Sequence, residues 1–79
     1  MKDQLEDLRK QIDEIDELIV SLLAKRMKIV KEIGRIKKEN NLPVFDKSRW
    51  QEVIKSKKGF LKKIWKIIHE EALKIENSI

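Results

Sequence analysis

The first half of the chain has the pattern of one unbroken amphipathic helix. From Asp3 to Asn40 there is no proline, and the only glycine is Gly34. At roughly 1.5 Å per residue such a helix would be about 57 Å long. Apolar residues recur along it at steps of three and four, which keeps them on one face. These residues are Leu5, Leu8, Ile12, Ile15, Ile19, Leu22, Val30 and Ile33. A chain of 79 residues is too short to cover this stripe, so the pattern predicts a homodimer.

Two shorter helices are expected after the long one. The long helix should end at residues 40–43, because Pro43 disfavours helical geometry in the residue before it. Asp46 is suited to cap a short second helix that ends near residues 57–59, where Gly59 supplies a left-handed conformation. A third helix is expected over residues 60–77. With no strand pattern, the sequence predicts a single all-α domain over residues 1–79, with a long, a short and a medium helix.

The composition limits the location and the partners of the protein. There is no cysteine, so disulfides and thiolate metal sites are excluded. Apolar runs reach only three or four residues, whereas a membrane span needs about 20 and a signal peptide about 7–15. We therefore expect a cytoplasmic protein. The net charge of +5 suits an anionic partner, and the abundance of lysine and glutamate is typical of thermophilic proteins.

Two cations interrupt the apolar stripe of the long helix. Arg26 and Lys37 occupy positions where the spacing calls for leucine or isoleucine, and about three turns separate them. A charge held toward a core is costly unless something compensates it. A solvated edge, an acidic residue or a bound anion would do so. With a bound anion, this face would be a pocket for a negatively charged ligand.

Four runs of residues stand in a characteristic order on the expected helices. They are Leu8-Arg9-Lys10-Gln11-Ile12-Asp13, Leu22-Leu23-Ala24-Lys25-Arg26, Val30-Lys31-Glu32-Ile33-Gly34-Arg35-Ile36-Lys37 and Pro43-Val44-Phe45-Asp46-Lys47-Ser48-Arg49. These runs resemble the all-helical chorismate mutase family, whose protomer has three helices and forms an intertwined dimer. The resemblance covers residues 5–50 and resumes around residues 67–76.

The resemblance implies an isomerase of phenylalanine and tyrosine biosynthesis. It would convert chorismate, a small dicarboxylate, to prephenate by a Claisen rearrangement that needs no cofactor, nucleophile or metal. The protein must hold the substrate in a chair-like conformer and stabilise the charge that develops at the breaking ether bond. Arginine grips a carboxylate with two hydrogen bonds, and lysine supplies a compact point charge.

The resemblance also implies roles for individual residues. Arg26 would bind one substrate carboxylate, and Arg9 of the partner chain would bind the other. Lys37 would donate to the ether oxygen, with Glu76 as the second donor there. The other residues expected around the substrate are Ile33, Asp46, Arg49, Trp50, His69 and Ala72.

At three of these positions the type of residue affects the expected site. A carboxylate only accepts hydrogen bonds, so Glu76 must be protonated to donate one, and turnover is expected to fall as the pH rises. Trp50 stands where the family usually has a glutamate that binds the substrate hydroxyl. Ala72 stands where family members often carry a hydroxyl residue.

Each candidate also has a purely structural interpretation. Arg26 and Lys37 can be seam residues whose stems pack while their charges reach water. Arg9 can form a surface ion pair with Asp13 or Asp16. Asp46 can simply cap the helix, and Trp50 can be a residue of the dimer core or pack on Phe45 across the helix start. His69 can be a partly exposed helix residue, and Glu76 can be a surface residue near a frayed C-terminus.

Other functions stay open at this point. An isochorismate pyruvate lyase on the same scaffold would use similar arginines and a lysine near the ether oxygen. A basic helical dimer could instead bind nucleic acid, with strong salt dependence. A coiled-coil dimer without a ligand would tolerate leucine at Arg26 and Lys37.

Overall fold

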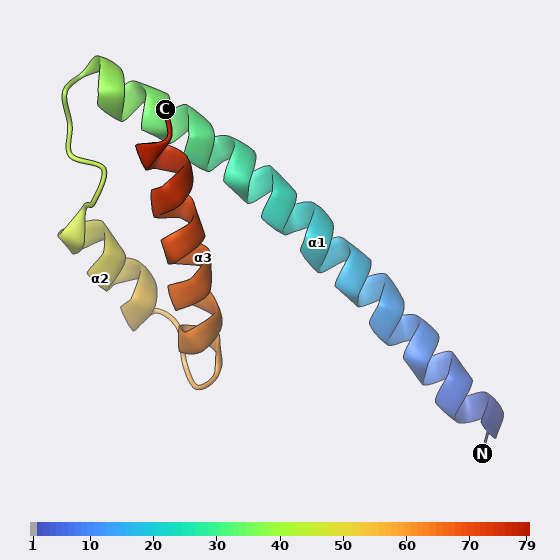
Figure 1. Cartoon of the computed structure of the whole chain (residues 1–79). Helices are drawn as coiled ribbons and strands as arrows, with labels where there is room; N and C mark the ends of the chain where they lie inside the picture. The colour runs from blue at the N-terminus through green and yellow to red at the C-terminus, as the bar shows by residue number, and fades with distance from the viewer. Residues whose placement is uncertain (1) are drawn as a thin grey trace.

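The computed structural model describes residues 2–79, which form three α-helices and no strand. Helix α1 spans Lys2–Glu39, α2 spans Lys47–Lys55 and α3 spans Leu61–Asn77 (Figure 1). The predicted all-α order of a long, a short and a medium helix is confirmed. None of these helices has the length and apolar character needed to cross a membrane.

Helix α1 is a rod that the rest of the chain covers only in part. The molecule measures 58 × 24 × 14 Å along its principal axes. Helix α3 packs against the C-terminal half of α1 and α2 packs against α3, whereas the N-terminal half of α1 extends beyond both (Figure 1). Every residue from Lys2 to Leu22 is exposed. The apolar stripe of this half therefore has no cover within the chain.

The ends of the first two helices follow from local hydrogen bonds. After α1, Asn41 has the left-handed φ of 54° that asparagine tolerates, and the Leu42 N–H donates to the Lys37 carbonyl over 2.8 Å. Asp46 is the N-cap of α2, as predicted, because its Oδ1 accepts from the Arg49 N–H at 3.0 Å.

Helix α2 is shorter than predicted, and it ends at Lys55 rather than near residue 58. The cause is Ser56, whose hydroxyl donates to the Val53 carbonyl over 2.6 Å and closes the last turn. Gly59 does adopt the predicted left-handed φ, at 60°, but it lies in the connection between α2 and α3. The third helix accordingly starts one residue late, at Leu61.

The core of the single chain is small. Its buried apolar residues are Val30 on α1 and Ile68 and Ala72 on α3, each 6–7% exposed. Gly34 of α1 is also buried at this contact. In contrast, the stripe residues Leu8 and Leu22 are 58% and 62% exposed. The fold thus packs α3 against the C-terminal half of α1 and leaves a long apolar face open.

Candidate active site

A pocket of about 440 Å³ lies where the three helices meet. Nine of the ten residues predicted for the site line it. They are Arg26, Ile33 and Lys37 on α1, Asp46, Arg49 and Trp50 at the start of α2, and His69, Ala72 and Glu76 on α3. Spacings of three, four and seven residues on α1 and α3 put these side chains on one face of each helix.

Five further residues line the pocket and were not predicted as site residues. All are aliphatic, and they are Ile29, Val30, Val44, Val53 and Leu73. Sequence reasoning assigns such residues to the core, because nothing in their chemistry separates a core wall from a pocket wall. For two of them the sequence did hold a signal, because Ile29 and Val30 lie between Arg26 and Lys37 on the same helix. They make the pocket predominantly apolar around a few polar groups, as ligand sites commonly are.

Lys37 is the centre of the polar contacts in the pocket. Its ammonium Nζ lies 2.6 Å from Glu76 Oε1 and donates to the Val44 carbonyl over 2.7 Å. The side chains of Lys37 and Glu76 are only 19% and 8% exposed. An ammonium carries three N–H donors, and the Val44 carbonyl accepts one of them, so N–H donors remain for a ligand.

The contact between Lys37 and Glu76 is one of charge rather than a well-formed hydrogen bond. The two atoms are close enough for an ion pair, yet the angles are not those of a hydrogen bond, and Oε1 has no hydrogen-bond partner among residues 2–79. The short distance decides the electrostatics, because opposite charges this close and this buried attract strongly. As a carboxylate, Glu76 can accept a hydrogen bond from a ligand, and only its protonated form could donate one.

Arg26 presents an unsatisfied cation to the same pocket. Its Nη1 is buried and has no hydrogen-bond partner among residues 2–79. Guanidinium does not lose its proton in proteins, so the charge cannot be relieved by neutralisation. A buried donor without a partner costs about 1–3 kcal/mol, and more when charged. An anion in the pocket would remove this penalty, and a carboxylate matches the planar guanidinium best.

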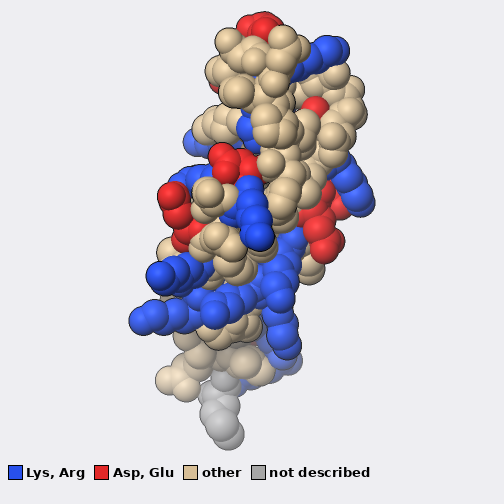
Figure 2. All heavy atoms as spheres, turned by 90° about the vertical axis from the view of Figure 1, so that its left-hand side faces the viewer, with Lys and Arg blue, Asp and Glu red and all other residues tan. Residues whose placement is uncertain are grey.

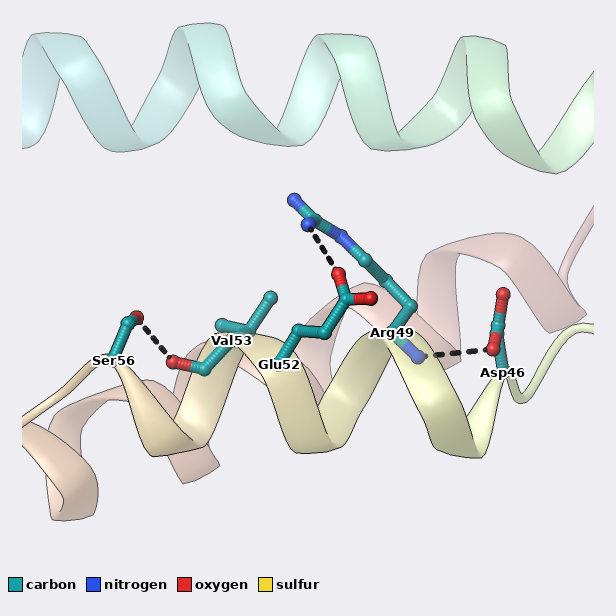
Figure 3. Close-up of polar contacts among 5 residues, drawn as sticks. All are labelled: Asp46, Arg49, Glu52, Val53 and Ser56. Carbon is teal, nitrogen blue, oxygen red and sulfur yellow. Dashed lines mark hydrogen bonds and ion pairs between the residues drawn. The ribbon is translucent and has the colours of Figure 1, made fainter.

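Arg49 supplies a second guanidinium from α2. Figure 3 shows its side chain reaching from α2 toward α1, on the same side as Asp46. Its Nη1 lies 3.4 Å from Glu52 Oε2, with both side chains about 70% exposed. Such a surface pair contributes little to stability, so the guanidinium is free to turn to a ligand.

His69 forms one wall of the pocket together with aromatic rings. Its imidazole stacks on Trp50 with ring centroids 4.0 Å apart and 13° between planes, and Phe45 packs on it at 5.8 Å. Burial lowers the pKa of His69 from 6.5; Arg26 and Lys37 lower it further, while Glu76 and Glu70 oppose them. Phe45 and Trp50, which were predicted to contact each other, each contact His69, and no direct ring contact between the two is found among residues 2–79.

Arg9 is the predicted site residue that the chain does not bring to the pocket. It lies on the exposed N-terminal half of α1, and its only ion-pair partner among residues 2–79 is Glu6, at 3.9 Å. The predicted alternatives, Asp13 and Asp16, do not pair with it. Because this half of α1 extends away from α2 and α3, Arg9 cannot serve the pocket of its own chain (Figure 1).

Comparison with known proteins identifies relatives that are similar in sequence. Residues 8–77 match the family model described as chorismate mutase type II. The chain is 47% identical over 51 residues to a bifunctional chorismate mutase/prephenate dehydratase of Aquifex aeolicus, covering 65% of this chain and 14% of that protein. It is 39% identical over 49 residues to a chorismate mutase of Methanocaldococcus jannaschii, covering 62% of this chain and 50% of that one. The chain therefore spans half or less of the length of these two relatives.

A solved structure is similar over nearly the whole chain. It is a conserved hypothetical protein from Pyrococcus furiosus, which is 44% identical with a TM-score of 0.87, and the match covers 92% of this chain and 95% of that one. The likeness in sequence and in fold agrees with the match to the family model. The chain belongs to the chorismate mutase type II family.

Proposed function

We propose that the protein is a chorismate mutase that converts chorismate to prephenate for the biosynthesis of phenylalanine and tyrosine. The observation that carries this proposal is the buried Nη1 of Arg26, which has no hydrogen-bond partner among residues 2–79 and lines the same pocket as the Lys37–Glu76 pair. A dicarboxylate with an ether oxygen between its carboxylates would satisfy both features. The family match supports the same substrate.

Two arginines of one chain hold the substrate in this proposal. Arg26 binds one carboxylate with two parallel hydrogen bonds, and Arg49 turns from Glu52 to the hydroxyl and carboxylate end beside Asp46. Ile33 and Ala72 form apolar walls, and the stacked Trp50 and His69 limit the space on one side. Holding a flexible substrate in a reactive chair form lowers the barrier by positioning alone.

Lys37 stabilises the charge that develops during the reaction. As the ether C–O bond breaks, negative charge builds on its oxygen, and the free N–H of Lys37 donates to that oxygen. Glu76 acts as the second donor when it is protonated, since only the acid form has a hydrogen to donate. Both groups lie in a largely apolar pocket, where a hydrogen bond to a developing charge is stronger than in water.

The requirement for a proton on Glu76 makes a testable pH dependence. We expect kcat to fall as the pH rises, because only a protonated carboxyl group can donate to the ether oxygen. Glutamine donates a hydrogen bond at every pH, so Glu76→Gln should give a flat profile between about pH 5 and 9. A flat kcat profile for the unmodified protein over this range would exclude Glu76 as a proton-dependent donor.

A second copy of the chain completes the site in this proposal. It covers the apolar stripe of α1 and brings its Arg9 to the second substrate carboxylate. Charge favours an antiparallel arrangement of the two copies. Residues 2–17 hold seven acidic and three basic side chains, whereas residues 53–69 hold six lysines and no acid. Figure 2 shows positive side chains crowding the middle of the face on the side of α2. The acidic half of one α1 would therefore lie toward the basic region of the partner.

The direct test is the loss of chorismate absorbance with purified protein, followed by identification of the product. We expect prephenate, and we expect Arg26→Ala to abolish its formation. Release of pyruvate from isochorismate, without turnover of chorismate, would identify the lyase instead. A folded protein that consumes neither compound would reject the enzymatic proposal.

A further inference from the structure

Gly34 lets α3 lie close to α1 beside the pocket. A Cβ atom at this position would be 3.2 Å from both Cα and Cγ of Glu76, and 2.6 Å from Cδ1 of Ile79. These separations are shorter than ordinary van der Waals contacts. Glycine destabilises a helix interior relative to alanine, so α1 carries a weakening residue where α3 needs the space.

The carboxyl group of Glu76 depends on this close approach for its position. Its Oε1 contacts Lys37 Nζ at 2.6 Å and has no hydrogen-bond partner among residues 2–79. The position of this oxygen therefore follows from the α3 backbone and from its ion pair with Lys37. Gly34 precedes Lys37 by one turn of α1, so the helix separation at Gly34 also sets the distance between the paired charges.

We propose that Gly34 is a positioning residue for Glu76. Its missing side chain sets the separation of α1 and α3 at which the Glu76 carboxyl meets Lys37 and reaches the pocket. This inference rests on the proposed function, in which Glu76 is the second donor to the ether oxygen.

The atoms of Ile79 and Glu76 that an added methyl group would meet differ in how easily they can move. Cδ1 of Ile79 is the end of a flexible side chain, which can rotate to another rotamer. Cα of Glu76 belongs to the backbone of α3, so its displacement moves the whole turn. Gly34→Ala should therefore shift Glu76 by a few tenths of an ångström, while Arg26 on α1 and Arg49 on α2 stay in place.

The test measures kcat and KM for chorismate with Gly34→Ala and with Gly34→Ala/Ile79→Ala. We expect kcat to fall about tenfold with little change in KM, because the reacting group moves and the substrate-binding arginines do not. Removing the Ile79 side chain should not restore kcat, because the contact with the Glu76 backbone persists. An unchanged kcat in Gly34→Ala, or recovery in the double variant, would overturn the inference.

Gly59→Ala is the control for a general loss of stability. Gly59 has a φ of 60°, and a Cβ atom added to it would have no neighbouring atom within 4 Å. Alanine is strained in this left-handed conformation, so the melting temperature should fall by several degrees. We expect kcat to stay unchanged. If kcat fell in both glycine variants in proportion to the melting temperature, a merely structural role for Gly34 would be the explanation.

A double-mutant cycle with Glu76→Ala isolates the coupling. If Gly34 acts through Glu76, Gly34→Ala should reduce kcat no further once Glu76 is alanine. An equal additional loss in that background would overturn the inference. A wild-type protein without chorismate turnover would overturn the proposed function and this inference with it. Wild-type turnover with no effect of Gly34→Ala would overturn the inference alone.

Discussion

At the scale of single residues, Arg26 and His69 place polar groups where burial makes them costly. The Nη1 of Arg26 is buried without a hydrogen-bond partner among residues 2–79, at a position where the helix pattern calls for an apolar residue. His69 stacks on Trp50 and contacts Phe45, and burial lowers its pKa. Each is a chemical group placed where a hydrophobic residue would pack at lower cost.

Arg26→Leu should therefore separate stability from function. We expect the free energy of unfolding in urea to rise by roughly 1 kcal/mol, because an unpaired buried charge is removed. Turnover of chorismate should fall at least about a hundredfold, because a preorganised carboxylate contact is lost. The matched control is Arg35→Leu, an exposed arginine on the same helix, which should change neither quantity appreciably. A less stable Arg26→Leu protein would contradict this account of the site.

The lowered pKa of His69 makes stability depend on pH. The folded state binds this proton less readily than the unfolded state, whose pKa is near 6.5. The favourable contribution of His69 to the free energy of unfolding is thus fully present above about pH 6.5. It is lost as the pH falls through the lower pKa of the folded state. His69→Gln should reduce the slope of unfolding free energy against pH between about pH 7.5 and 5. Equal slopes for the two proteins would show that His69 is not held neutral by the fold.

At the scale of elements, the structure shows which local signals decide where a helix begins and ends. The cap at Asp46 and the break before Pro43 were predictable, because each rests on the chemistry of one residue. The end of α2 was predicted too late, because Gly59 gave a stronger signal than Ser56. A serine hydroxyl that closes a helix by bonding to a carbonyl is hard to recognise from sequence, since serine is common in many positions.

Asp46 has both a capping role and a place in the pocket, and the two can be separated. Asp46→Ala should lower the free energy of unfolding by about 1 kcal/mol, because the Arg49 N–H loses its acceptor. Asparagine caps a helix about as well as aspartate, so Asp46→Asn should retain stability while removing the charge. Unfolding in urea measures both variants. Equal losses for alanine and asparagine would show that charge, and not the cap, stabilises α2.

At the scale of the whole molecule, much of the pocket could be predicted from the sequence. Arg26, Lys37 and Glu76 come together because helix periodicity and the order of the elements place them on facing surfaces. The Lys37–Glu76 ion pair was not predicted, because its distance depends on how closely α3 approaches α1 at Gly34. The stack of Trp50 on His69 likewise depends on the angle between α2 and α3, which no local pattern encodes.

A single chain leaves two features without a partner. The apolar stripe of α1 is open, with Ile12 57% exposed and Ile15 52% exposed, and Arg9 is distant from the pocket. A patch of this length is unusual for a monomer and is typical of an interface. One arrangement accounts for both features, namely a second copy whose α1 covers the stripe and delivers Arg9. The central claim is therefore a chorismate site built from two chains.

Subunit complementation tests this claim most directly. Arg9→Ala and Arg26→Ala are each expected to lack turnover of chorismate. When the two variants are unfolded together and refolded as a mixture, half of the dimers should be hybrids, and one of their two sites has both arginines. If each site is shared between two chains, the mixture should recover about one quarter of the wild-type rate. Half of the dimers are hybrids, and one of the two sites in each hybrid is complete. No recovery in a mixture that contains hybrid dimers, or full activity of Arg9→Ala alone, would contradict a shared site.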